Sequence, residues 1–148
     1  GYRAQFAAAG YQRNLVCDCD GYRLNALDTS TYADVGGAEL RRLRRTPHVN
    51  NENKKLFFPW VELECQRGVG LAAGQGSAPL VALQTSNDGG QTFGVSRERS
   101  VGALGEYTVR TRWNQCGSAR DRQWQVWSSD PVATRWFNLN IGVKPGRT

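Results

Sequence analysis

Residues 86–93, with the sequence SNDGGQTF, fit the pattern Ser-x-Asp-x-Gly-x-Thr-aromatic that is often called an Asp-box. An aspartate in a turn accepts hydrogen bonds from backbone N–H groups, and glycine adopts the positive φ that a tight turn requires. The box therefore predicts a β-hairpin, with its aromatic residue packed onto the core to fix the register. It indicates no catalysis, because its polar groups bind their own backbone. The residues that define the box are Ser86, Asp88, Gly90, Thr92 and Phe93.

Few other side chains suit catalysis. His48, the single histidine, follows Pro47, and a lone histidine is more typical of a structural or surface residue than of a base. Glu62 and Glu64 are expected to face solvent or an arginine cluster; a glycosidase pair stays open, although such pairs come from separate elements. No serine lies in a nucleophile elbow and no paired-histidine metal motif is present, so we expect no enzymatic activity from this chain.

The four cysteines are Cys17, Cys19, Cys65 and Cys116. A structural zinc site needs two closely spaced pairs, and this sequence has one. Cys17 and Cys19 are two apart on a predicted strand, so they point to one face and do not pair easily with each other. We therefore expect buried free thiols in a reducing compartment, without a bound metal.

Two further ligand motifs fail on inspection. A calcium loop beginning at Asp18 would have Arg23 and Thr29 where glycine and glutamate are needed. The residues Gly68-Val69-Gly70 open a dinucleotide fingerprint, but no helix pattern follows, Pro79 interrupts the stretch, and no acidic residue lies at a strand end about 20 positions further on. We expect no cofactor, and we interpret the Gly- and Ala-rich stretch 68–79 as a long surface loop.

Composition indicates a globular protein with a basic surface. Apolar residues make up 39% and charged residues 22% of the 148 residues, which suits one domain of ordinary size. No apolar run approaches the ~18 residues that span a membrane. The net charge of +6 can attract nucleic acid, an acidic membrane surface or an acidic protein. The chain begins at Gly1 and contains no methionine, so we expect a trimmed or processed part of a longer protein.

Short extended stretches recur at the spacing of an all-β protein, and no helix of ordinary length is indicated. The stretch 38–45 has leucines three apart, as in a helical turn, but it is short and Pro47 ends it, so we interpret it as a strand. We expect 122–128 to pair with 106–113 and to direct Trp124 and Val126 inward. The sequence thus predicts a single β domain over 1–148, an antiparallel β-sandwich or barrel-like fold with long loops. The predicted strands are 14–19 and 22–27 (joined by an Asp20-Gly21 turn), 38–45, 56–65, the apolar run 80–83, 106–113, 122–128, and one or two within 132–143.

Arginines gather at two places. The first cluster comprises Arg41, Arg42, Arg44 and Arg45. It forms either a solvated face or a contact with phosphate or acidic side chains. The second cluster comprises Arg110, Arg112, Arg120 and Arg122, near two predicted strands. Arginine favours planar, bidentate contact with carboxylate or phosphate, so both clusters need partners.

Several segments, taken in order along the chain, carry a family resemblance. They are DGYRL (20–24) with LD (27–28), RRTPH (44–48), ELE (62–64) with GVG (68–70), GQG (74–76), the Asp-box, GEY (105–107) with Arg110 and Trp113, GSARDR (117–122) and SDPV (129–132). Together they resemble the packaged-DNA stabilisation proteins of short-tailed bacteriophages, which form the tail hub or nozzle beneath the portal. The resemblance spans most of the chain and keeps its order, which makes it more specific than the Asp-box alone.

The resemblance implies a virion structural protein, present as a homo-oligomeric ring. Such a ring attaches below the portal or adaptor protein after DNA packaging, extends the tail channel through which the genome is ejected, helps retain the packaged DNA, and docks other tail proteins. It implies a location in the virion tail, and in the host cytoplasm during assembly, with no membrane partner. Members of this family are longer, so the chain would correspond to a late portion of a tail-hub protein.

In a ring, the second arginine cluster would contact Glu106, Asp121 or Asp130 of the same or the next chain; pairing within the chain is the alternative. For the first cluster we favour protein contact over DNA, because dense positive charge on a channel wall would impede sliding DNA. A carbohydrate-binding or sialidase-like β module is an alternative function, although a propeller repeats its box in each blade and this chain has one. A charge-driven nucleic-acid-binding β-barrel is another.

Overall fold

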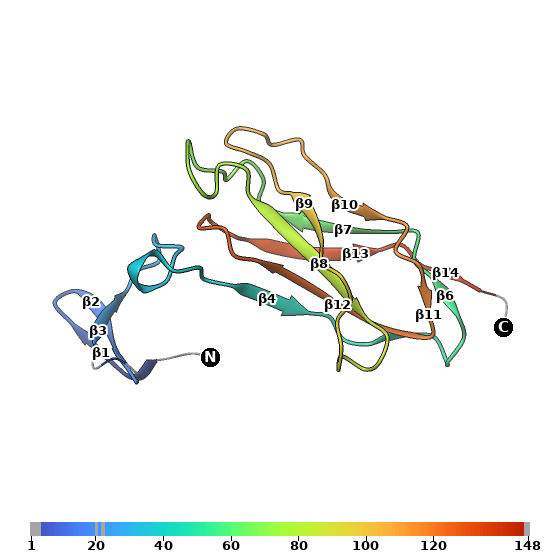
Figure 1. Cartoon of the computed structure of the whole chain (residues 1–148), viewed down its shortest axis with the longest axis horizontal. Coiled ribbons are helices and arrows are strands. Elements are labelled where there is room, and N and C mark those ends of the chain that lie inside the picture. The colour runs from blue at the N-terminus through green and yellow to red at the C-terminus, as the bar shows by residue number, and fades with distance from the viewer. Residues whose placement is uncertain (1–3, 20, 22, 147–148) are drawn as a thin grey trace. The chain divides into compact units, whose positions relative to one another are not determined.

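The computed structural model describes residues 4–19, 21 and 23–146 (Figure 1). The chain forms two compact units, Gly1–Glu39 (unit 1) and Leu40–Thr148 (unit 2), and the residues of each unit make most of their contacts within that unit. The sequence predicts one domain over 1–148, so the division into two units is a feature that composition did not indicate. No described segment forms a helix of the length and apolar character that crossing a membrane requires.

Unit 1 is a three-stranded antiparallel sheet in the order β1-β2-β3. Its strands are β1 (Ala4–Gly10), β2 (Arg13–Asp18) and β3 (Leu24–Leu27), followed by a single 3-10 turn, η1 (Val35–Gly37). The predicted strands at 14–19 and 22–27 are thereby confirmed in their central residues. Asp20 and Tyr22, at the predicted turn, lie outside the described residues; the Asp18 backbone N–H donates to the carbonyl of Arg23 at 2.9 Å.

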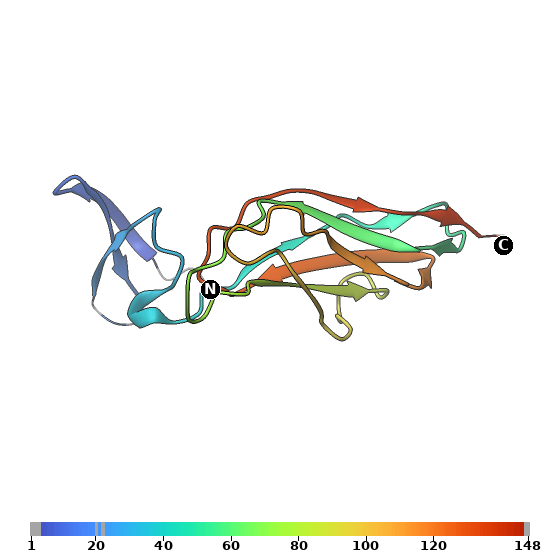
Figure 2. The ribbon, with the colours of Figure 1, turned by 90° about the horizontal axis from the view of Figure 1, so that it is seen from above.

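Unit 2 holds two antiparallel sheets that form a sandwich, together with a small third sheet at one end (Figure 1). The first sheet has the order β10-β7-β13; the second has the order β4-β12-β8-β9, with β5 also paired to β12; the third has the order β11-β6-β14. Figure 2 shows β7 and β13 in one layer and β8 and β12 in the other. The all-β fold with antiparallel sheets is confirmed. The strands are β4 (Arg42–Arg45), β5 (Val49–Asn50), β6 (Leu56–Phe57), β7 (Trp60–Cys65), β8 (Leu80–Ser86), β9 (Arg97–Ser100), β10 (Thr111–Asn114), β11 (Ser118–Ala119), β12 (Asp121–Ser128), β13 (Trp136–Ile141) and β14 (Lys144–Pro145).

Alternation along the strands builds the core between the two layers. In β7 every second residue, beginning with Val61, is buried, as the sequence predicts. Trp124 and Val126 of β12 face inward, also as predicted, and the Trp124 ring meets Phe58 edge-on with ring centroids 5.4 Å apart. The buried core comprises Leu56, Phe58, Val61, Leu63, Cys65, Val81, Leu83, Val101, Trp113, Cys116, Trp124 and Val126.

The predicted pairing of 106–113 with 122–128 is wrong. β12 pairs with β4, β5 and β8, whereas β10 pairs with β7 in the other sheet. The strand at 106–113 begins only at Thr111, because 101–110 forms a looped segment in which Gly102 and Gly105 have positive φ. Tyr107 lies in this looped segment and is 69% exposed.

Other expectations hold in part. The stretch 38–45 is extended rather than helical, and β4 occupies its second half. Pro59 separates β6 from β7, which divides the predicted strand at 56–65 in two. The segment 68–79 is a loop, as predicted, and carries no helix that a dinucleotide site would need. Strand β1 was not predicted as a separate strand.

Candidate contact surfaces

The Asp-box forms a closed network of hydrogen bonds in the connection between β8 and β9, which pair as the predicted hairpin. Asp88 Oδ1 accepts from the backbone N–H groups of Gln91 and Thr92 at 3.1 and 3.0 Å, and from the Ser86 hydroxyl at 2.6 Å. Ser86 Oγ in turn accepts from the Gly90 N–H at 2.9 Å. These donors, led by the Ser86 and Thr92 hydroxyls, hold the pKa of Asp88 far below its usual range. The carboxylate therefore stays ionised, and its oxygens accept the hydrogen bonds that close the turn.

Glycine is required at position 90. Gly90 has a φ of 86°, in the left-handed region where a residue with a Cβ is strained. The atom nearest to a Cβ there would be Gln123 Oε1, the end of a flexible side chain on β12 that can move aside, so the backbone conformation is the reason for glycine.

The expected role of Phe93 is wrong. The ring is half-buried, lies outside the buried core, and has the guanidinium carbon of Arg45 4.6 Å from its centroid. Arg45 also donates to Gln125 Oε1 at 2.7 Å, on the face of β12 that is turned away from the core. The aromatic residue of the box therefore covers the outer face of the second sheet.

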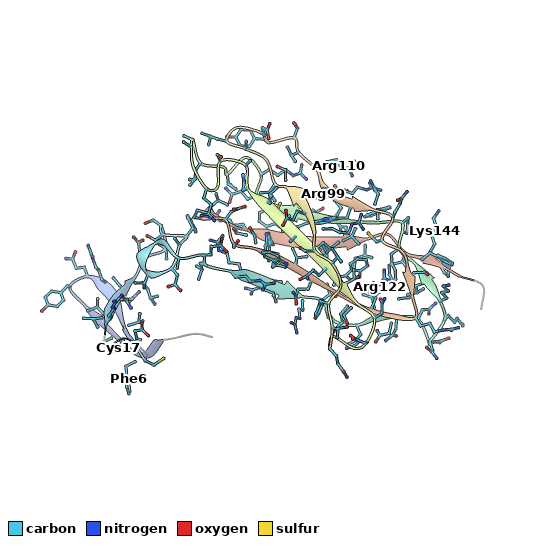
Figure 3. All side chains as sticks on the ribbon, in the orientation of Figure 1. Phe6, Cys17, Arg99, Arg110, Arg122 and Lys144 are labelled. Atoms are coloured by element: carbon cyan, nitrogen blue, oxygen red, sulfur yellow. The ribbon has the colours of Figure 1, made fainter. Side chains whose placement is uncertain are left out.

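Two arginines of the second cluster are paired within the chain. Arg110 donates to both carboxylate oxygens of Glu62, at 2.9 and 2.7 Å, and Arg112 Nη1 lies 3.7 Å from Glu62 Oε2 (Figure 3 labels Arg110). The Arg110 hydrogen bonds hold the pKa of Glu62 below its usual value. Arg112 also stacks on Trp60, 4.5 Å from the ring centroid. Glu62 is thus a carboxylate neutralised by arginine, which suits a proton donor poorly.

The carboxylates expected to pair with these arginines are engaged elsewhere. Glu106 accepts from the Ala103 N–H at 2.9 Å, and Asp130 accepts from the Leu80 N–H at 2.6 Å. Asp121 Oδ2 lies 2.7 Å from His48 Nδ1, which fixes the histidine beside β12. Within this chain, the predicted ion pairs between the second arginine cluster and these three carboxylates are therefore wrong. The pairing of β10 with β7 brings Glu62 to Arg110 instead.

Arg122 lies inside the fold. It is 5% exposed, and it donates to Asn87 Oδ1 at 2.8 Å, to the carbonyl of Ser118 at 3.1 Å, and to the carbonyl of Cys116 (Figure 3). Its guanidinium carbon lies 4.8 Å from the centroid of Phe58. These contacts link the Asp-box loop to β12 and to the segment before it, so Arg122 is occupied within the chain.

Arg120, the fourth member of the second cluster, is exposed. It donates to the carbonyl of Asn53 at 2.6 Å, which ties the segment after β11 to the loop between β5 and β6.

The first cluster is divided between the two faces of β4. Register places Arg45 opposite Gln125, and Arg44 opposite the buried Val126, so alternate arginines point to opposite sides of the sheet. On the outer side, Arg41 stacks over Trp127, 4.3 Å from the ring centroid. On the inner side, Arg42 donates to the carbonyl of Val132 at 2.8 Å and to the Thr134 hydroxyl. Arg44 is exposed and donates to the carbonyl of Leu43 at 3.1 Å.

A groove of about 950 Å³ opens between β4 and β13, on the side where both sheets have an edge. Its floor includes the buried Leu63 and Val126, and Arg42, Arg44 and Arg135 lie along it, whereas the side chains of Arg41 and Arg45 are on the other side of β4. The sequence predicts the arginines but not the groove, because β13 comes some ninety residues after β4 and no local pattern relates them.

The remaining ligand-type residues do not converge in the described part of the chain. No group of three or more histidine, cysteine, aspartate or glutamate residues there is arranged to hold a metal ion. Cys65 and Cys116 are buried free thiols, whereas Cys17 is half-buried and Cys19 is exposed, beyond the end of β2. Burial raises the pKa of the Cys65 thiol.

Comparison with known proteins identifies the sandwich. Residues 41–144 match the family model described as Bacteriophage P22 Gp10, beta-sandwich. The match covers more than two thirds of the chain and lies within unit 2. No curated protein matches the sequence.

Proposed function

Because this chain belongs to the bacteriophage P22 Gp10 beta-sandwich family, a tail hub or nozzle-type family of short-tailed phages, we propose a place for it in the head-to-tail junction. The chain is a bacteriophage tail structural protein. In the proposed role its subunits form a ring that extends the tail channel below the portal or adaptor protein. The ring helps retain the packaged DNA and docks other tail proteins, and the protein is located in the tail of the virion.

The observation that supports this proposal most strongly is the extent of the family match. It covers 41–144, from β4 to the start of β14, so it rests on the whole sandwich and not on one turn. The Asp-box by itself would also suit a sialidase-like module. Here the box lies in a sandwich, and the hydroxyl and carboxylate groups of Ser86 and Asp88 are bound within the loop, which leaves no specific feature that favours a sugar site.

The arginines support protein contact over DNA contact. The first cluster borders a groove with an apolar floor, whereas a DNA-binding surface presents basic groups to a phosphate backbone. Arg110 and Arg122 have their donors engaged within the chain. The surfaces left for neighbouring proteins are therefore the rim of this groove and the exposed loops.

Disruption of the gene in its phage tests the proposal. We expect the mutant to make heads that package DNA but fail to keep it, so that the DNA becomes sensitive to DNase, with rescue when the intact gene is supplied in trans. Mass spectrometry of purified virions should find the protein, and negative-stain images of the purified protein should show rings. Filled heads with complete tails in the mutant would contradict the proposal, and saturable binding on a glycan array would favour the carbohydrate-binding alternative.

A further inference from the structure

The two long sides of the sandwich are closed in different ways. Between β9 and β10, side chains donate to backbone carbonyls of the opposite sheet. Thr111 Oγ1 donates to Ser100 at 3.0 Å, and Trp113 Nε1 donates to Arg97 at 2.7 Å. Arg99 Nε donates to the carbonyl of Arg112 at 3.1 Å on the same side (Figure 3 labels Arg99). This side is sealed by hydrogen bonds that cross from sheet to sheet.

The opposite side, between β4 and β13, is open along most of its length. Arg42, at the beginning of β4, donates hydrogen bonds to Val132 and Thr134, in the segment that precedes β13. β4 and β13 each have one neighbouring strand. Alternate N–H and C=O groups of each strand therefore point away from that neighbour, as an edge strand presents them to an added strand.

The floor of the groove needs apolar cover. Leu63 and Val126 belong to the core, and Leu139 of β13 packs against it. Phe137 occupies the irregular register between Trp136 and Asn138 and is 69% exposed at the rim. A volume of about 950 Å³ is large enough for several residues of an extended peptide, since whole small-molecule sites occupy roughly 300–1,000 Å³.

The charge around the groove has one sign. Arg42 and Arg44, on the inner side of β4, and Arg135, before β13, line the groove with basic side chains, and no acidic residue lines it among the described residues. Arg44 is best placed to bind a carboxylate of another protein. Its side chain is exposed on the groove side of β4, and its hydrogen bond goes to the carbonyl of the preceding residue. Guanidinium groups in this position suit carboxylates, with which they form bidentate, charge-assisted hydrogen bonds.

We propose that the groove between β4 and β13 binds an extended segment of another tail protein, in which apolar residues alternate with aspartate or glutamate. An added strand pairs with outward-pointing backbone groups of an edge strand, its apolar side chains cover Leu63 and Val126, and its carboxylates meet the arginines along the groove. Alternation is required because successive side chains of a strand point in opposite directions. That the segment comes from another tail protein rests on the proposed function. The expected composition of the segment follows from the residues that line the groove.

Peptide selection on the full chain tests this inference. A phage-displayed library of random 12-residue peptides is selected on the immobilised protein, and selected peptides are synthesised and titrated against the wild type, R44E and R99E. Arg99 is the control for charge reversal outside the groove, because it lies on the edge strand β9 of the same sheet and also donates to the carbonyl of its preceding residue; R99E loses in addition the hydrogen bond to the carbonyl of Arg112. We expect selected peptides in which apolar and acidic residues alternate, with binding about tenfold weaker in R44E and nearly unchanged in R99E.

Hydrogen exchange locates the bound peptide. Binding is expected to slow amide exchange within 42–45 or 136–141 and to leave 97–100 unchanged. If R44E lowers the melting temperature relative to the wild type, R44Q replaces it. Selected peptides that are basic, equal affinity of the wild type and R44E, or no protection in either strand would each overturn the inference. Two other results would also overturn the inference by showing that the groove has a different occupant. One is preferential binding of DNA at this groove, and the other is the formation of concentration-dependent dimers that protect the same amides without peptide. If the purified protein forms rings in electron micrographs but binds no peptide, the peptide-binding role of the groove is rejected and the proposed tail function is retained.

Discussion

Replacement of Arg122 by methionine is expected to destabilise unit 2 more than any change at an exposed arginine. The side chain is 5% exposed and has three hydrogen-bond acceptors, Asn87 Oδ1 and the carbonyls of Cys116 and Ser118. Methionine fills most of the volume but donates nothing. The carbonyl of Cys116 would then lose its donor in a buried place and that of Ser118 in a half-buried one, whereas the exposed Asn87 can turn to water, which makes R122M a test of the internal role of this arginine.

The magnitude follows from two opposing effects. A hydrogen bond from a charged donor contributes about 1.5–3 kcal/mol, so three of them give a gross loss of roughly 4–9 kcal/mol. The substitution also removes the cost of burying a guanidinium group, which is several kcal/mol, and retains apolar packing on Phe58. We expect a net loss of about 3 kcal/mol in the free energy of unfolding, and a fall in the melting temperature on the order of 10 °C.

Equilibrium urea denaturation followed by tryptophan fluorescence measures the effect, because Trp113 and Trp124 are fully buried. R122K retains the charge but lacks the planar fork, so we expect about half of the loss. R135M is the control, since Arg135 is exposed, and it should change the stability by less than about 0.5 kcal/mol. If R122M were as stable as R135M, the interpretation of Arg122 as an internal link would be wrong.

Three further changes test other parts of the structure. Arg110 holds the pKa of Glu62 below its ordinary 4.5, so this carboxylate stabilises the fold above that pH; the stability difference between wild type and E62Q, measured in urea at several pH values, should be largest near neutrality and shrink as the pH falls through the folded-state pKa. D88A removes the acceptor on which the Asp-box turn closes, and amide exchange within 87–96 should accelerate while β12 stays protected; D88N, which retains one carbonyl oxygen, should lie between. A chain of 40–148 keeps the whole buried core, so it should unfold cooperatively at nearly the same urea concentration as the full chain, as circular dichroism would show; a molten product would contradict the division into two units.

The sequence predicts elements of this fold where a local pattern decides them. The alternation in β7 follows from period two, and the Asp-box follows from turn chemistry that acts over four residues. Trp124 and Val126 are large and alternate, so their burial is also predictable. In each case the residues that determine the structure are close together in the chain.

Pairing between distant strands is not predictable in the same way. β10 and β12 are close in the sequence, with only the two-residue β11 between them, and a hairpin between them satisfies every local rule, yet they belong to opposite sheets. The choice depends on contacts with β7 and β8, which lie far away in the sequence. The partner of Arg110 depends on the same pairing, because only the register of β10 on β7 brings Glu62 within reach.

Burial then separates arginines that look alike in the sequence. Arg122 stabilises the interior, and Arg110 neutralises Glu62, so substitution of either would alter folding before it altered assembly. Arg44 stands on an edge strand over an open groove and contributes little to the core, so its charge can be reversed with the sandwich intact. A tail protein must both fold and bind its neighbours, and these two requirements fall on different arginines. A defect in tail assembly caused by R44E, in a protein whose stability is unchanged, would therefore report on binding alone.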